Sequence, residues 1–89
     1  GEDMPGVCRN VDIAGGLLIA TQSTVKANGN NIIRNGDPVT GHGSGVHASP
    51  IMIAGSNNVF VGGVAVCNAG DLATCGHPAT GSSNVNVGN

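Results

Sequence analysis

The chain is short, weakly charged and almost free of aromatic residues. It has 89 residues, of which 39% are hydrophobic, 1% aromatic and 9% charged, and its formal net charge is −2. This length allows one domain with a small core, and the composition lacks the low hydrophobicity and high net charge of disordered proteins. The basic residues Arg9, Lys26 and Arg34 are too few to neutralise the several phosphates on which nucleic-acid affinity depends. We therefore expect a small folded domain with no nucleic-acid partner.

The segment ahead of Met4 has the character of a remnant of a cleaved expression tag. We accordingly leave residues 1–3 out of the fold argument. Residues 4–89 are expected to form the single domain.

Short β-type segments, separated by Asn, Gly and Ser, dominate the chain. In chain order they are residues 17–19, 25–27, 31–33, 51–53, 59–61, 64–66 and 85–87. Asn28-Gly29 and Gly62-Gly63 lie between neighbouring segments, where the turn of a two-residue hairpin needs positive φ angles. No window has the apolar spacing of a helix, and 16 glycines are scattered throughout. The sequence predicts an all-β fold of short hairpins without helices.

These segments recur as a repeat. Residues 25–37 align with residues 59–71 without a gap. Residues 7–12 match the end of this unit, and residues 82–89 match its beginning. The sequence therefore predicts three hairpin units with pseudo-threefold symmetry, one of which is divided between the two ends of the chain.

Each unit ends in an aspartate, and the connection that follows it varies. The aspartates are Asp12, Asp37 and Asp71, and the connections are residues 13–20, 38–54 and 72–80. An aspartate at a turn usually accepts hydrogen bonds from nearby backbone amides, so we interpret these carboxylates as structural and not as catalytic acids or bases. Only the second and third connections contain His or Cys.

Four potential metal ligands lie in those two connections: His42, His47, Cys75 and His77. Their equivalent positions after Asp37 and Asp71 predict that they converge. Three imidazoles and one thiolate suit a tetrahedral zinc ion, and four protein ligands leave no position for water, which is typical of a structural site. We predict one structural Zn²⁺ per chain, with solvent-exposed histidines and a buried Cys75 as the alternative.

The other two cysteines, Cys8 and Cys67, occupy the repeat position at which the remaining unit has Ile33. Small apolar behaviour is therefore expected of them, and we predict that they belong to the core. An odd total of three cysteines also argues against a disulfide framework.

A hairpin of the form Val-x-Val-x-Gly, then a four-residue motif, then x-Gly-Asp, resembles the PAAR-repeat family. The resemblance extends over the chain from Met4 onward. The family's Pro-Ala-Ala-Arg tetrad is replaced by Asn31-Ile-Ile-Arg34, Ala65-Val-Cys-Asn68 and Gly6-Val-Cys-Arg9. The chain would therefore be a divergent member.

This resemblance implies a small pointed cone with a zinc ion near its apex, held by three His and one Cys, which carries over to His42, His47, Cys75 and His77. It also implies a function without catalysis. The cone would cap and sharpen a trimeric β-helical spike of a contractile phage tail or a type VI secretion system, one cap per trimer. Such a tip is delivered outside the producing cell, touches the target envelope transiently and can carry effector proteins.

Two other functions are weighed against this one. A zinc-dependent hydrolase would use Asp37 or Asp71 as its base. A small β-solenoid-like binding module would also account for the Gly, Asn, Thr and Val repeats, although three uneven units make a poor solenoid. Val25, Val59 and Val85 share one repeat position, and the sequence leaves open whether they face a spike or the core.

Overall fold

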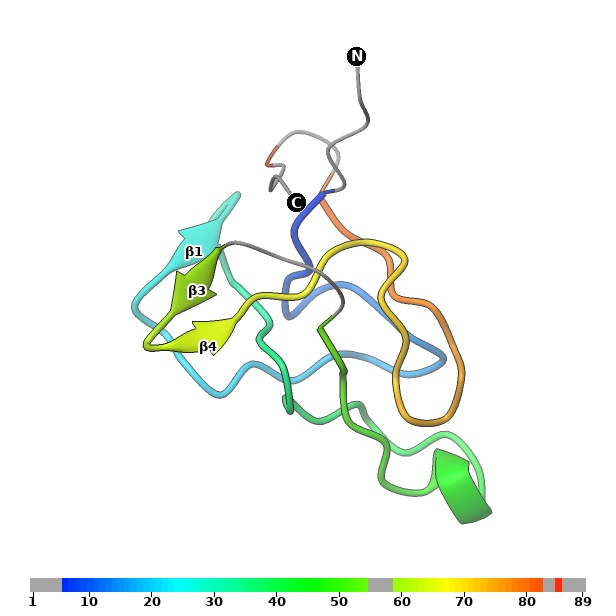
Figure 1. Ribbon diagram of the computed structural model, residues 1–89. Helices are drawn as coiled ribbons and strands as arrows, with labels where there is room; N and C mark the ends of the chain where they lie inside the picture. The colour runs from blue at the N-terminus through cyan, green and yellow to red at the C-terminus, as the bar shows by residue number, and fades with distance from the viewer. Residues whose placement is uncertain (1–5, 55–58, 83–84, 86–89) are drawn as a thin grey trace.

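The computed structural model describes residues 6–54, 59–82 and 85. Two small antiparallel hairpins carry its named strands, and Figure 1 shows them side by side at one end of the molecule. Strand β1 (Lys26–Ala27) pairs with β2 (Asn30–Asn31), and β3 (Phe60–Val61) pairs with β4 (Val64–Ala65). The fold is all-β, as predicted. The proposed tag remnant and the predicted strand residues 86–87 lie outside the described residues.

Both predicted hairpin turns are confirmed. Asn28 and Gly29 have φ angles of 55° and 79°, and Gly62 and Gly63 have φ angles of 61° and 80°. Two successive residues with positive φ twist a two-residue turn in the sense that matches the strands beside it. Asn is one of the few residues with a side chain that tolerates this conformation, which explains its place at position 28.

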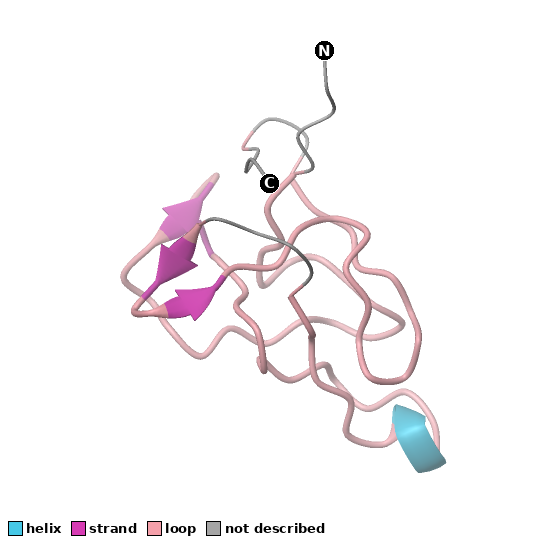
Figure 2. Cartoon of the chain, in the orientation of Figure 1, coloured by secondary structure: helices cyan, strands magenta, loops and turns pink. Residues whose placement is uncertain are grey.

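The predicted strands are shorter than expected, and Figure 2 draws most of the chain as loop. Residues 17–19 and 51–53 form only isolated bridges, such as Leu18 with Val39 and Met52 with Ala73. Ile51 pairs instead with Pro38, so neighbouring residues of one segment meet different partners. A continuous ladder needs successive residues to pair with the same strand, and this winding path prevents it.

One helical turn interrupts the β structure, contrary to the prediction of no helix. It is the 3-10 helix η1 (Gly45–His47), and the described residues contain no α-helix. Helical periodicity does not reveal a turn of three residues, because it is shorter than one period. No described helix has the length or the apolar character that would be needed to cross a membrane.

The centre of the molecule is a closed ring of backbone hydrogen bonds. The Cys8 amide donates to the Cys67 carbonyl at 2.9 Å, the Cys67 amide to the Ile33 carbonyl at 2.9 Å, and the Ile33 amide to the Cys8 carbonyl at 3.0 Å. All three residues are 0% exposed. We call these three residues the central ring. Each of its amides and carbonyls is satisfied by the next residue around it, as buried backbone groups require.

Two further sets of three hydrogen bonds lie on either side of the central ring. On the side of the strands, the amide–carbonyl pairs are Val7 with Val85, Ile32 with Val25, and Val66 with Val59. On the other side, they are Ile19 with Pro38, Ile53 with Leu72, and Thr80 with Ile13. The first pair of the first set joins the two ends of the chain. Each set thus contains three backbone hydrogen bonds between corresponding positions of the chain.

Small aliphatic side chains fill the interior around this ring. The larger buried cluster consists of Cys8, Ala14, Leu18, Ile33, Val39, Met52, Cys67, Ala73 and Ala79. A second cluster beneath the strands consists of Val7, Ala27, Ile32, Val61 and Val66. Neither contains an aromatic residue, so the core contributes limited apolar area to stability.

The three aspartates accept backbone hydrogen bonds, as predicted. The Oδ2 atoms of Asp12, Asp37 and Asp71 each accept from the amide three residues earlier, at 2.9, 2.8 and 2.9 Å. Each aspartate amide in turn donates back to the carbonyl of that same earlier residue. This reciprocal pair of bonds closes the turn at the end of each unit.

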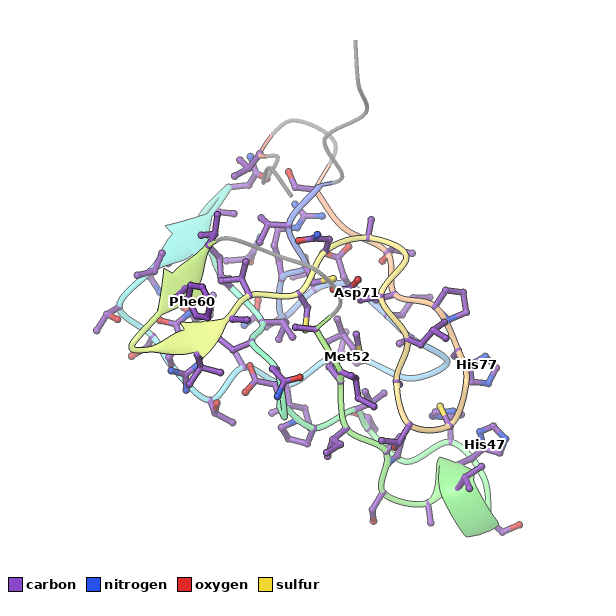
Figure 3. All side chains as sticks on the ribbon, in the orientation of Figure 1. His47, Met52, Phe60, Asp71 and His77 are labelled. Carbon is purple, nitrogen blue, oxygen red and sulfur yellow. The ribbon has the colours of Figure 1, made fainter. Side chains whose placement is uncertain are left out.

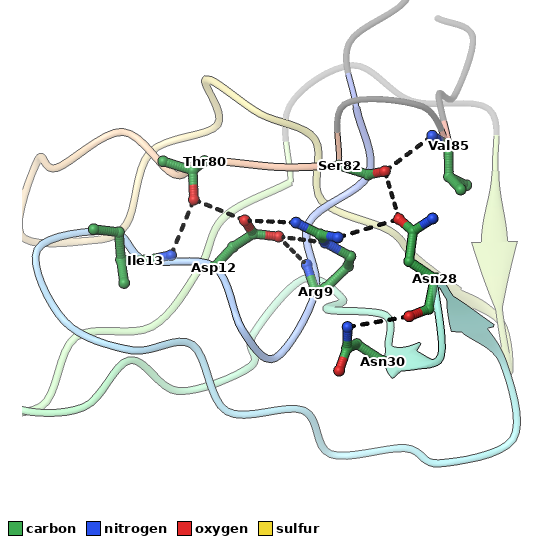
Figure 4. A network of polar contacts seen from close by, with 8 residues as sticks. All are labelled: Arg9, Asp12, Ile13, Asn28, Asn30, Thr80, Ser82 and Val85. Atoms are coloured by element: carbon green, nitrogen blue, oxygen red, sulfur yellow. Dashed lines mark hydrogen bonds and ion pairs between the residues drawn. The ribbon is translucent and has the colours of Figure 1, made fainter.

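Asp12 also anchors a polar network that ties the two ends of the chain together (Figure 4). The Arg9 guanidinium donates to both oxygens of Asp12, at 2.9 and 3.3 Å, and to Asn28 Oδ1 at 3.1 Å. Ser82 donates to the same Asn28 oxygen and accepts from the Val85 amide. Burial raises the pKa of Asp12, but hydrogen bonds from Arg9 and from the Thr80 hydroxyl outweigh that effect and hold the pKa below its usual value.

Candidate metal centre

The structure brings together all four residues that the sequence singled out. The ligand atoms of His42, His47, Cys75 and His77 lie within 4.8 Å of one another. Figure 3 shows His47 and His77 at the end of the molecule opposite Phe60 and the strands. The three imidazole centroids form a nearly equilateral triangle with sides of 5.1, 5.1 and 5.2 Å. This cluster, which we call the His3Cys group, could hold a metal ion.

The spacing of the donor atoms fits a tetrahedral ion. Zn–N bonds of about 2.0–2.1 Å and Zn–S bonds of about 2.3 Å put tetrahedral donors about 3.3–3.6 Å apart. His47 Nδ1 lies 3.2 Å from His42 Nε2, and Cys75 Sγ lies 3.6 Å from the same nitrogen. Nitrogen and thiolate donors together suit zinc, and four of them complete its shell. These two distances match the expected spacing, whereas the group as a whole extends to 4.8 Å, so metal binding by these residues stays a prediction that requires some closure of the loops.

His42 is oriented for this task by the backbone. Its Nδ1 lies 3.0 Å from the Thr40 carbonyl oxygen, which can only accept a hydrogen bond. The proton therefore belongs on Nδ1, and Nε2 presents a lone pair toward Cys75 and His47. A carbonyl that holds the second ring nitrogen of a ligating histidine is a common feature of metal sites.

The loop that carries His42 and His47 is closed on itself. The His42 amide donates to the His47 carbonyl at 2.9 Å, and the His47 amide donates to the Ser44 carbonyl at 3.2 Å within the η1 turn. Gly41 has no room for a side chain, because a Cβ there would lie 2.5 Å from the Ala48 carbonyl oxygen. The turn at Gly45 needs a φ of +64°. Glycines let this loop fold tightly enough to aim both rings at one point.

A tight turn also brings Cys75 and His77 together. The Ala73 amide donates to the His77 carbonyl at 3.0 Å, and the Gly76 amide donates to the Ala73 carbonyl at 2.9 Å. Gly76 lies between the two ligands with a φ of +91°, a conformation that strains residues with a side chain. The two side chains therefore emerge on the same side of the turn.

Sequence reasoning missed the contribution of Gly15 and Gly16. They belong to the one connection without His or Cys, yet they lie directly behind the His3Cys group. A Cβ at Gly15 would come within 2.6 Å of His42 Nε2 and 2.5 Å of His77 Cδ2, and one at Gly16 within 2.9 Å of His42 Nδ1. The adjacent glycines were the available signal, since two in succession often mark a close approach of backbone.

The His3Cys group has little apolar support. None of its four residues is buried, and η1 contains no buried residue. Cys75 packs against the larger core cluster. Burial therefore contributes little to the order of the loops at this end.

The other two cysteines belong to the core, as predicted. Cys8 and Cys67 are 0% exposed, and both thiols are free. Burial raises the pKa of Cys67 to about 12, and burial together with the nearby Cys67 raises the pKa of Cys8 well above its usual range. Both thiols stay protonated at neutral pH, whereas a metal ligand must be a thiolate.

Comparison with known proteins gives no assignment. No protein-family model matches the chain. A search of curated protein sequences finds no match either.

Proposed function

We propose that this protein is a zinc-stapled tip that caps a trimeric spike. In this proposal the protein is a pseudo-threefold cone. The His3Cys group lies at its apex, and the strands lie at its wide end. The observation that carries it is the closed ring of Cys8, Ile33 and Cys67 with matching sets of three hydrogen bonds on either side. A single chain with internal threefold repetition can present similar contacts to each of three identical subunits.

The wide end has a surface suited to such contacts. Val25 and Val59 are 38% and 37% exposed, and Val85 is half-buried. The carbonyls of these three residues make equivalent hydrogen bonds. We propose that these valines contact the spike, one for each subunit. An interface built on aliphatic side chains would also cover strand edges that are otherwise open to aggregation.

The metal would have a structural role in this protein. Three imidazoles and a thiolate saturate a tetrahedral ion, so no position remains for a reacting water. The described His3Cys group includes no carboxylate that could act as a base. Asp37 is buried and accepts hydrogen bonds from the Arg34 amide and the Thr21 hydroxyl. These features favour a tip over a zinc-dependent hydrolase.

The proposed role is mechanical. The cap would keep the spike sharp while a contractile phage tail or type VI secretion system drives it through an envelope. Zinc would hold the apex in one shape where apolar packing is sparse. Effector proteins remain possible additional partners, and the tip would act outside the cell that produced it.

Stoichiometry tests this proposal most directly. Co-expression with a trimeric β-helical spike fragment should yield a complex of one cap and three spike chains, measured by light scattering. Val59→Glu, at the wide end, should weaken the complex at least about ten-fold by placing a charge in an apolar contact. Val46→Glu, at the metal end, is the matched control and should leave it intact. Three caps per trimer, or equal binding to monomeric spike chains, would contradict the proposal.

A further inference from the structure

A cavity of about 540 Å³ opens on one side of the molecule, and its lining includes Gly76, which lies between Cys75 and His77 of the His3Cys group. Its walls include Ile53, Leu72, Ala73 and Thr74, and its one charged lining residue is Asp71. Ile53 is 49% exposed and Leu72 is 51% exposed, although both are large aliphatic residues. Solvent-exposed apolar side chains that line a pocket are a common property of binding sites.

The backbone beneath the cavity is held in place by hydrogen bonds. The Ile53 amide donates to the Leu72 carbonyl at 3.1 Å, and the Thr74 amide donates to the Ile51 carbonyl at 2.8 Å. Ala73, in the floor, is 3% exposed and belongs to the larger core cluster. The hollow is therefore built into the scaffold.

Asp71 differs from its two equivalents. Oδ1 of Asp12 accepts from the Thr80 hydroxyl, and Oδ1 of Asp37 accepts from the Thr21 hydroxyl. Oδ2 of Asp71 accepts from the Asn68 amide at 2.9 Å, but within residues 6–54, 59–82 and 85 no group donates to its Oδ1. The third carboxylate of a repeating set thus has an oxygen available beside an apolar hollow.

Among the described residues, no Lys or Arg side chain donates a hydrogen bond to Asp71 Oδ1. Arg9 is bound to Asp12 and Asn28. Arg34 donates to the Val61 carbonyl and the Thr21 hydroxyl, and Lys26 donates to Asn31. Asp71 Oδ1 can therefore accept a hydrogen bond from a cationic group of another molecule.

We propose that this cavity binds a lysine side chain from a partner protein. A lysine has a long aliphatic stem, which would lie against Ile53 and Leu72, and an ammonium group at its end, which would donate to Asp71 Oδ1. An ammonium suits this position because it acts as a point charge and needs only one acceptor oxygen. The cavity lining shares no residue with the proposed spike contact at Val25, Val59 and Val85, so a second partner could bind while the spike is capped.

The test uses n-hexylammonium as the probe and the zinc-loaded full chain. In an NMR titration, we expect saturable shifts of the amides of residues 71–74. n-Hexanol, with the same alkyl chain and no charge, should bind at least about ten-fold more weakly, because a charge-assisted hydrogen bond is stronger than a neutral one. Equal binding of the two probes would mean an apolar pocket without charge recognition and would overturn the proposal.

Variants make the assignment specific. Asp71→Asn should weaken hexylammonium binding about ten-fold, whereas Asp12→Asn, the same change at the equivalent position, should leave it unchanged. Should Asp71→Asn fail to fold, Leu72→Ser replaces an exposed wall residue and should weaken both probes. Undiminished binding in the folded Asp71 variant, or in Leu72→Ser, would contradict the proposal.

Discussion

The central ring and the end that carries the His3Cys group differ in how much of their structure is buried. Around the central ring, side chains of Cys8, Ile33 and Cys67 are fully buried, and every ring amide has a backbone acceptor. Around the His3Cys group, no ligand is buried and the η1 turn has no buried residue. The centre is an ordinary, if small, packed core, and the end with the His3Cys group is a set of loops whose four potential ligands face one another.

This difference shows how a chain with a single aromatic residue can bring distant loops together at one end. Burial supplies stability only where enough apolar area can be enclosed, and three loops at the end of a small domain enclose very little. A metal ion joins such loops without a core, since its bonds are few, short and directional. The predictions below challenge this division of roles.

The largest effect should follow loss of the metal. Zinc binding in small modules is worth about 10–16 kcal/mol apparent at neutral pH, similar to the whole stability of a domain, about 5–15 kcal/mol. Cys75→Ser should therefore abolish stoichiometric zinc binding and lower the free energy of unfolding by several kcal/mol. Metal analysis and thermal unfolding with and without a chelator measure both effects.

Cys67→Ala provides the matched control, because it removes a sulfur from the central ring and not from the His3Cys group. It should retain one zinc ion per chain and cost about 1–2 kcal/mol for a small buried truncation. Loss of zinc from this variant would show that the wrong sulfur has been assigned to the metal.

Ile33→Ala tests the contribution of the central ring to stability directly. The Ile33 side chain is fully buried in the central ring, and the truncation leaves a cavity among small residues that cannot easily fill it. We expect a loss of about 2–5 kcal/mol in chemical denaturation. Zinc content at neutral pH should stay at one per folded chain. Loss of zinc from a variant that stays folded would show that packing in the central ring and metal binding by the His3Cys group are coupled, contrary to our inference.

Asp12→Asn should have a smaller effect than Ile33→Ala, and its effect should depend on pH. The folded-state pKa of Asp12 is held below its usual value, so its ionised form stabilises the fold above about pH 3.9, the unfolded value. We expect a loss of about 1–3 kcal/mol at neutral pH. The difference between the two proteins should shrink as pH falls from about 4 through the lower folded pKa. Any effect of acid on the rest of the protein is common to both, so this difference isolates the carboxylate, and a constant difference would contradict its ionised role.

The sequence predicted best where local chemistry decides the conformation. Positive φ angles at Asn28-Gly29 and Gly62-Gly63 follow from the residues alone, and so do the backbone hydrogen bonds of Asp12, Asp37 and Asp71. The burial of Cys8 and Cys67 in the core was predicted from their alignment with Ile33 in the repeat. Convergence of the four ligands was expected from the same comparison, and the structure does place them together.

Tertiary features escaped prediction because no local pattern encodes them. Strand lengths depend on which neighbour each residue meets, and at residues 51–53 that neighbour changes from one residue to the next. The role of Gly15 depends on two rings from distant loops, His42 and His77. Within the described residues, Asp71 Oδ1 lacks the hydroxyl donor that Asp12 and Asp37 have, which alignment of the repeats did not reveal.

The hydrogen bond between the Val7 amide and the Val85 carbonyl bears on the order in which the molecule assembles. The loops that supply the metal ligands, and the partners of Cys8 in the central ring, are all present once the chain has been made as far as residue 77. Val7 meets its partner only when residue 85 has emerged from the ribosome. Contacts of such wide sequence separation form slowly, because a long loop must close before they contribute. The Val7 amide should therefore be among the last to acquire hydrogen-exchange protection, and among the first to exchange under mild denaturation.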